Sequence, residues 1–138
     1  MKISAMSGIA KTVLGICLFY LSSTVAAQDA PNSKYVEISP SFVTNYDEGA
    51  RLKYLKARVA LEVTPESEER IWHHLPSIQN ALVLLFSAQA EENLTSTVGR
   101  ESLRREALME VQQAMRTLEK DGDKQIKDLY FTDFVVQQ

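Results

Sequence analysis

The sequence predicts an α+β fold in which a small sheet of about three strands packs on a layer of two helices. Residues 35–63 and 126–137 have the composition and alternation of strands. Residues 65–120 repeat apolar side chains every three or four positions, which is the period of a helix. The chain has 138 residues, enough for one domain. The expected order is therefore strand, strand, helix, helix, strand (ββααβ).

The first 27 residues predict an export signal. Lys2 and Lys11 precede the apolar run TVLGICLFYL, residues 12–21, and small residues follow up to Ala27. This order of basic, apolar and small-residue segments is typical of a secretory signal peptide. Cleavage after Ala27 would leave residues 28–138.

The alternative is that the same segment stays in the chain as a membrane anchor. The uncharged stretch 12–28 has about 17 residues, the lower limit for crossing a bilayer. In both cases Lys2 and Lys11 stay in the cytoplasm and the rest of the chain is exported. Residues 28–34, QDAPNSK, then form a polar linker to a domain at 35–138.

The exported part contains no cysteine, because Cys17 lies in the apolar run. Disulfides, thiol catalysis and cysteine metal sites are therefore excluded there. Removal of Lys2 and Lys11 changes the formal net charge from −3 to −5. An acidic domain without a basic cluster is a poor candidate for binding nucleic acid.

Two strands joined by a turn are expected at 35–46 and 51–63. Pro40 cannot donate a ladder hydrogen bond, so it marks an edge or a bulge in the first strand. The turn is DEGA, residues 47–50, and a short turn makes the pair an antiparallel hairpin. The core-facing positions of the second strand are Leu55, Ala57, Val59, Leu61 and Val63.

The first helical segment begins at Thr64, which suits the N-cap, and Pro65, which suits the first helical position. Pro76 removes a backbone hydrogen bond, so we expect a kink or two abutting helices near Leu75. Residues 87–96 end this element as a connecting loop. The apolar stripe consists of Ile71, Leu75, Ile78, Leu82 and Leu85.

The second helix is expected from about Thr97 to Lys120. Ser96 is its predicted N-cap, and Gly122 is a suitable stop after it. The inward face comprises Leu103, Ala107, Leu108, Val111, Ala114, Met115 and Leu118.

The last strand, 126–137, has an unusual composition. In a regular strand Phe131 and Val135 share one face, and Tyr130, Phe134 and Val136 share the other. Both faces would then be largely apolar, as expected of a strand covered on both sides. The second cover is either the domain's own loops or a neighbouring subunit, so Phe134 and Val136 are candidate partner-binding residues.

His73 and His74 raise the possibility of a metal site. Neighbours on a helix point about 100° apart, so they need a third ligand from elsewhere, and no typical ligand spacing supplies one. A periplasmic module for a small ligand or metal remains the alternative to an interaction protein. The chain has only these two histidines, which are neighbours on one helix, so it offers few residues for a Ser-His-Asp catalytic array. We therefore expect no catalytic residue, no cofactor and no enzyme.

Four further side chains are candidates for partner binding. Trp72 adjoins the apolar stripe and is expected in the core, with a partner contact as the alternative. Arg100, Arg104 and Arg105 are expected to form a solvated helix face, in which Glu101 pairs with Arg105. The alternative is that these arginines dock an acidic neighbour.

Residues 75–115, LPSIQNALVLLFSAQAEENLTSTVGRESLRREALMEVQQAM, resemble the core of the FliL family of flagellar basal body-associated proteins. The ending DLYFTDFVVQ is similar to the family's terminal strand, and KYLKARVALEV, residues 53–63, to a strand that leads into a helix. The resemblance covers about residues 35–137. Its features are Leu75-Pro76 before a helix, Ser87, Glu92 with Leu94, and Gly99-Arg100.

The resemblance implies a stomatin-like (SPFH-like) domain on the periplasmic side of the inner membrane. It also implies a ring-like homo-oligomer around the motor's stator units, supporting rotation, swimming, swarming and chemotaxis without catalysis. Two features depart from the family. The N-terminal segment is short and resembles a cleavable signal, and Thr97 and Val98 replace a frequent Pro-acidic pair. The protein is then either a short-anchored member or a soluble periplasmic paralogue.

Overall fold

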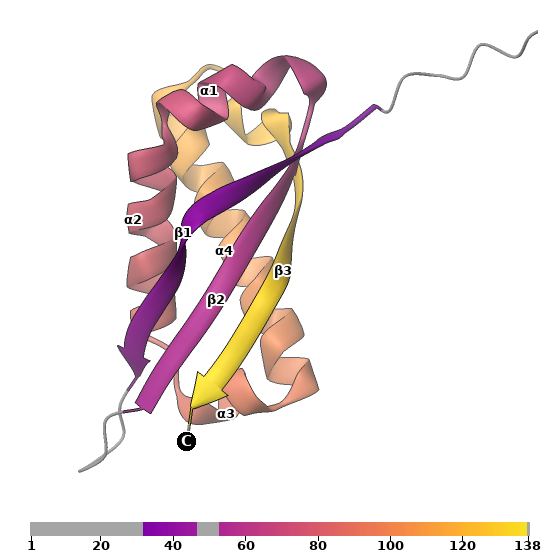
Figure 1. The fold of residues 1–138 in the computed structure, drawn as a ribbon. Coiled ribbons are helices and arrows are strands. Elements are labelled where there is room, and N and C mark those ends of the chain that lie inside the picture. Colours follow the sequence, from indigo (N-terminus) through magenta and orange to yellow (C-terminus); the bar gives the residue numbers. More distant parts are fainter. Residues whose placement is uncertain (1–31, 47–52, 138) are drawn as a thin grey trace, which may run out of the picture.

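The computed structural model describes residues 32–46 and 53–137, which form an α+β domain with a three-stranded antiparallel sheet and several helices (Figure 1). The predicted signal or anchor and the DEGA turn lie outside the described residues. The elements, in chain order, are β1 (Lys34–Tyr46), β2 (Lys53–Val63), the 3-10 turn η1 (Pro65–Ser67), α1 (Glu68–His73), α2 (Leu75–Ser87), α3 (Glu91–Thr95), α4 (Thr97–Leu118), the 3-10 turn η2 (Gly122–Gln125) and β3 (Ile126–Gln137).

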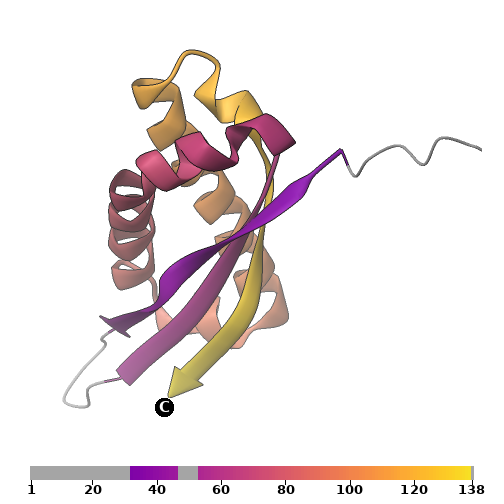
Figure 2. The same cartoon turned by 45° about the horizontal axis from the view of Figure 1, so that its top comes forward.

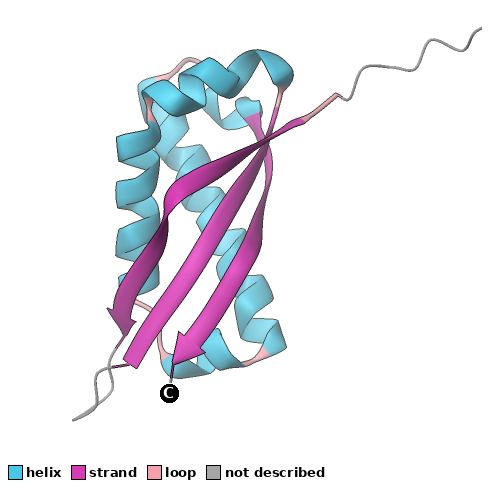
Figure 3. Ribbon diagram, viewed as in Figure 1, coloured by secondary structure: helices cyan, strands magenta, loops and turns pink. Residues whose placement is uncertain are grey.

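The sheet has the strand order β1-β2-β3, and the described helices all lie over one of its faces (Figure 3). The core lies between these two layers. The central strand is therefore β2, whereas β3, expected as a strand covered on both sides, is at an edge. β2 pairs antiparallel with β1 on one side and with β3 on the other.

The alternation predicted for β2 is confirmed. Leu55, Ala57, Val59 and Leu61 are fully buried, because they face the helices. The irregularity predicted at Pro40 is also confirmed, since the register of β1 against β2 shifts between Ile38 and Phe42.

The break predicted near Leu75 is present as two abutting helices. The last residue of α1 is His73 and the first of α2 is Leu75, so Pro76 falls in the first turn, where its missing N–H costs little. Ile71, Ile78 and Leu82 are buried, as the stripe predicts. Residues 87–96 are not a simple loop, because they contain α3, which buries Leu94.

The predicted start and inward face of α4 are largely confirmed. The Ser96 hydroxyl accepts a hydrogen bond from the Gly99 N–H at 2.9 Å. Leu118, however, is 44% exposed, because α4 ends at this residue, before the expected Lys120. The buried positions are Leu103, Ala107, Val111 and Met115.

Gly122 is required for a reason other than the predicted helix stop. The left-handed residue after α4 is Asp121, with φ of 56°. At Gly122 the chain passes so close to α4 that an added Cβ would lie 2.2 Å from the Met115 carbonyl oxygen. The glycine thus permits a close approach between η2 and the last turn of α4.

A β-bulge in β3 overturns the prediction of two apolar faces. Arg58 pairs with Asp133 and Val59 with Phe131, so Thr132 is an extra residue opposite this pair. One extra residue reverses the alternation that follows it. Phe131, Phe134 and Val136 consequently pack against the core on the same side as Leu129, while Asp133 and Val135 belong to the open face.

Candidate interaction site

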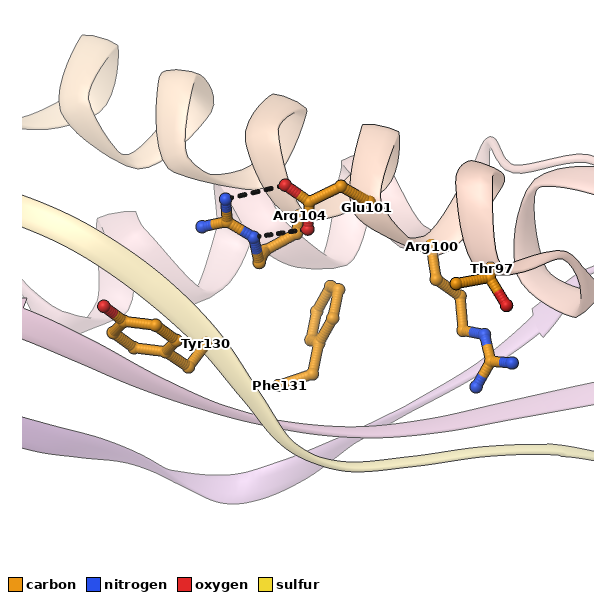
Figure 4. A pocket seen from close by; sticks show the side chains of 6 residues that line it. All are labelled: Thr97, Arg100, Glu101, Arg104, Tyr130 and Phe131. Atoms are coloured by element: carbon orange, nitrogen blue, oxygen red, sulfur yellow. Dashed lines mark hydrogen bonds and ion pairs between the residues drawn. The ribbon is translucent and has the colours of Figure 1, made fainter.

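A shallow groove runs between the N-terminal half of α4 and the edge strand β3; we call it the α4–β3 groove. Its first part has a volume of about 400 Å³ and is lined by Thr97, Arg100, Glu101, Arg104, Tyr130 and Phe131 (Figure 4). A second part of about 220 Å³ is lined by Leu94, Thr95, Arg100, Phe134 and Val136. Arg100 lines both parts and therefore stands where they meet.

Arg104 closes one end of the α4–β3 groove. Its Nε and Nη2 donate to the two carboxylate oxygens of Glu101, each at 2.9 Å. Its Nη1 donates to the Leu129 carbonyl oxygen at 3.0 Å and also to Asp128. The Arg104 side chain is only 22% exposed, so it ties α4 to β3. The prediction that it belongs to a solvated face is wrong, because Asp128 and Leu129 are brought to it by the fold.

These contacts shift the pKa values of Glu101 and Arg104 in opposite directions. Hydrogen bonding from Arg104, assisted by Arg105, lowers the pKa of Glu101 from 4.5 to about 2. The same hydrogen bond to Glu101 raises the pKa of Arg104. Arg104 and Glu101 are therefore both ionised at neutral pH, and charge-assisted hydrogen bonds hold their geometry.

Arg100 and Arg105 remain on the surface, as the sequence predicts. Arg105 Nε donates to Glu101 at 3.1 Å, which confirms the predicted pair, and its side chain is 70% exposed. The Arg100 guanidinium lies 5.9 Å from the centre of the Phe134 ring, within the range of a cation–π contact. No carboxylate of the described residues lies within 4 Å of it.

Phe134 and Val136 lie on the inner face of β3 instead of on an open face. Both are partly buried, and both reach solvent through the α4–β3 groove. The centres of the Phe131 and Phe134 rings lie 4.9 Å apart, and the centre of the Phe86 ring of α2 lies 5.9 Å from that of Phe131. The floor of the groove is thus an extension of the aromatic core.

Trp72 is 46% exposed, so the expectation that it belongs to the core is wrong. Ile71 occupies the inward position of the short helix α1, and its neighbour is turned outward. Figures 1 and 2 place α1 at the opposite end of the domain from α3. Trp72 therefore does not belong to the α4–β3 groove.

His73 and His74 flank the junction of α1 and α2. Their rings pack edge to face with centres 4.8 Å apart, and His74 Nε2 hydrogen-bonds to Glu119 Oε1 at 2.8 Å. This hydrogen bond lowers the pKa of Glu119. Within residues 32–46 and 53–137, no three His, Asp or Glu side chains form a group that could hold a metal ion.

The open face of the sheet carries an apolar hollow that sequence reasoning missed. The rings of Tyr35 and Tyr130 lie 6.1 Å apart, and Ala60 is buried between their strands. The Tyr130 hydroxyl donates to Glu62 at 3.0 Å, which raises the pKa of Tyr130 to about 12. The sequence feature that indicates this hollow is Ala60, because it interrupts the charged outward positions of β2.

The helices in the described parts of the chain include none that is both long and apolar enough to cross a membrane.

Comparison with known proteins agrees with the resemblance seen in the motifs. The family model of the flagellar basal body-associated protein FliL matches residues 35–137. A relative, the flagellar protein FliL of Aquifex aeolicus (strain VF5), is 24% identical over 102 residues. That alignment spans 73% of this chain and 60% of the relative's length. The chain belongs to the FliL family of flagellar basal body-associated proteins.

Proposed function

We propose that this protein is a non-enzymatic accessory component of the flagellar motor. It supports stator function and thereby flagellar rotation, swimming and swarming motility, and chemotaxis. The observation that carries the proposal is the family match, which extends over residues 35–137 and so includes nearly all of the described domain. Two surfaces are available for contacts with motor proteins, namely the α4–β3 groove and the apolar hollow between Tyr35 and Tyr130 on the open face of the sheet.

The proposal includes a stomatin-like domain that assembles into a ring-like homo-oligomer. The arrangement of two strands, a run of helices and a final strand is compatible with that fold. A ring needs two different surfaces on each subunit that are complementary to one another. The helical layer covers one face of the described sheet, so the other face and the β1 edge are available for such contacts (Figure 1).

We place the domain, residues 35–138, on the periplasmic side of the inner membrane. Residues 1–27 would either anchor it there or be removed as a signal peptide, and 28–34 would be the linker. Mass spectrometry of the protein purified from its native host separates the two forms. A mature chain that begins at Gln28 is soluble in the periplasm unless partners hold it, whereas a retained Met1 region indicates an anchor.

Deletion of the gene tests the motor role. We expect slower swimming and reduced swarming, with the number of flagella unchanged in electron micrographs, because the defect lies in rotation. Expression of the wild-type chain from a plasmid should restore both. Normal motility of the deletion strain, under conditions in which the wild type expresses the protein, would refute the proposal.

A further inference from the structure

The outer edge of β3 is closed near its start and open beyond Leu129. The Ile126 carbonyl accepts a hydrogen bond from Gln112 Nε2 at 3.0 Å. The Leu129 N–H donates to Asp128 Oδ1 at 2.8 Å, and the Leu129 carbonyl accepts from Arg104 at 3.0 Å. Side chains thus hold both backbone groups of this residue, which point away from β2. Backbone groups and side chains alternate together along a strand, so residues that share the inner face with Leu129 also share its edge.

Phe131, Phe134 and Val136 are the residues that share this face and edge. Their N–H and C=O groups consequently point away from β2, and no other element of residues 32–46 and 53–137 supplies them a hydrogen-bond partner. An edge with unpaired backbone groups is a template for a further strand. The opposite edge of the sheet is less suitable, because Pro40 and the β1 bulge interrupt it.

The helical layer extends past this open edge. Figures 1 and 2 show the first turns of α4 beside the outer edge of β3, beyond the three strands. A fourth strand next to β3 would therefore have one face covered by α4, along the α4–β3 groove. Phe131 stands between β3 and α4 in Figure 4, with Arg100 at one side and the Arg104–Glu101 pair at the other.

The charge of the site indicates which strand it accepts. Arg100 has no carboxylate of the described domain within 4 Å, although the chain as a whole has a net charge of −3. Phe131 and Phe134 offer apolar surface on either side of it. Side chains two residues apart in a strand point to the same face. A segment with an apolar residue and a carboxylate at that spacing can contact the phenylalanines and Arg100 together.

We propose that an extended segment of a partner protein adds to β3 along Phe131–Val136 as a fourth strand. Its backbone pairs with the open edge, its apolar side chain packs on the aromatic floor of the groove, and its carboxylate binds Arg100. The Arg104–Asp128 cap at Leu129 marks where the added strand ends. This inference rests on the proposed role as a binding protein and adds the chemistry of the segment that is bound.

Synthetic peptides of about seven residues, the length of an ordinary strand, test the proposal on the full chain in detergent. One peptide has valine and aspartate two positions apart among threonines, a second has lysine in place of the aspartate, and a third has a central proline that prevents pairing. We expect saturable binding of the aspartate peptide and about tenfold weaker binding when Arg100→Glu replaces an attraction by a repulsion. Arg70→Glu, a matched change on the exposed side of α1, should leave the affinity within about twofold.

Hydrogen exchange by NMR locates the bound strand. The amides of Phe131, Phe134 and Val136 should gain protection with the aspartate peptide and not with the proline peptide. Equal binding of the lysine or proline peptide, protection elsewhere, or no saturation below about 1 mM would overturn the proposal. Protection that rises with protein concentration alone would show that a second copy occupies the edge, and would also overturn it. Peptide binding with normal motility after deletion would refute the motor role and leave this site standing.

Discussion

Replacing Arg104 by alanine should destabilise the domain much more than replacing its neighbour Arg105. Arg104 makes hydrogen bonds to Glu101, Asp128 and the Leu129 carbonyl, and only 22% of its side chain is exposed. Among the described residues, Arg105 makes one hydrogen bond, to Glu101, and its side chain is 70% exposed. The two residues are adjacent on α4 and chemically identical, so they form a matched pair.

The expected cost follows from those contacts. A hydrogen bond that involves a charged group contributes about 1.5–3 kcal/mol, and the partial exposure of the partners reduces this contribution. Summing the bonds to Asp128 and Leu129, with the exposed pair to Glu101 adding little, gives about 2 kcal/mol for Arg104→Ala. In a domain of about 100 residues this lowers Tm by roughly 10 °C. Arg105→Ala should change the free energy of unfolding by less than about 0.5 kcal/mol.

Urea unfolding followed by circular dichroism measures both variants, and pH provides a second readout. The pKa of Glu101 is about 2 in the folded domain and 4.5 ordinarily, so its ionisation stabilises the fold above pH 4.5 and ceases to do so as pH falls towards 2. Because the exposed pair to Glu101 adds little, the gap in the free energy of unfolding between wild type and Arg104→Ala should narrow only slightly across this range. Equal effects of the two substitutions would refute the tie between α4 and β3.

Three further substitutions test other features of the fold. Phe134→Asp should lower the free energy of unfolding by about 3 kcal/mol, whereas Val135→Asp, at a position that is 50% exposed, should lower it by less than about 0.5 kcal/mol; the reverse order would show that the strand has no bulge. Gly122→Ala should cost about 2 kcal/mol, because its Cβ would lie 2.2 Å from a carbonyl oxygen of α4, and a Tm equal to that of wild type would contradict this close approach. Tyr130→Phe should abolish the tyrosinate absorbance step near pH 12, because the hydrogen bond to Glu62 holds the pKa there; this bond stabilises the fold below pH 10 and is lost as pH rises through 12. Loss of a step near pH 10 instead of pH 12 would mean that the hydrogen bond does not form in solution.

Sequence periodicity predicted the regular elements well. The inward positions of β2 and most of those of α4 are buried as expected, because the period of a strand or helix is a local property. Pro40 and Pro76 correctly marked a bulge and a helix junction, since proline removes a specific donor wherever it stands. The family was also recognisable, because its motifs are short runs at fixed spacing.

Contacts between residues that are far apart in the sequence cannot be predicted from periodicity. Helix periodicity predicts a solvated face for Arg104, since it carries no information about Asp128, which is 24 residues further along the chain. The position of Trp72 beside the apolar stripe predicts a core residue, yet Ile71 is the buried residue of the short α1. The α4–β3 groove depends on how far α4 projects past the sheet, which is a matter of packing.

The last strand shows most clearly which properties are local to the sequence and which depend on the tertiary structure. The sequence by itself determined that residues 126–137 form a strand and that this strand is unusually apolar. Only the tertiary structure decided which side each residue faces, because pairing with β2 accommodates Thr132 as a bulge and reverses the alternation after it. A register is a relation between two strands, so the composition of one strand cannot specify it. The same pairing turns Phe134 and Val136 inward and leaves their backbone groups on the open edge beside Arg100.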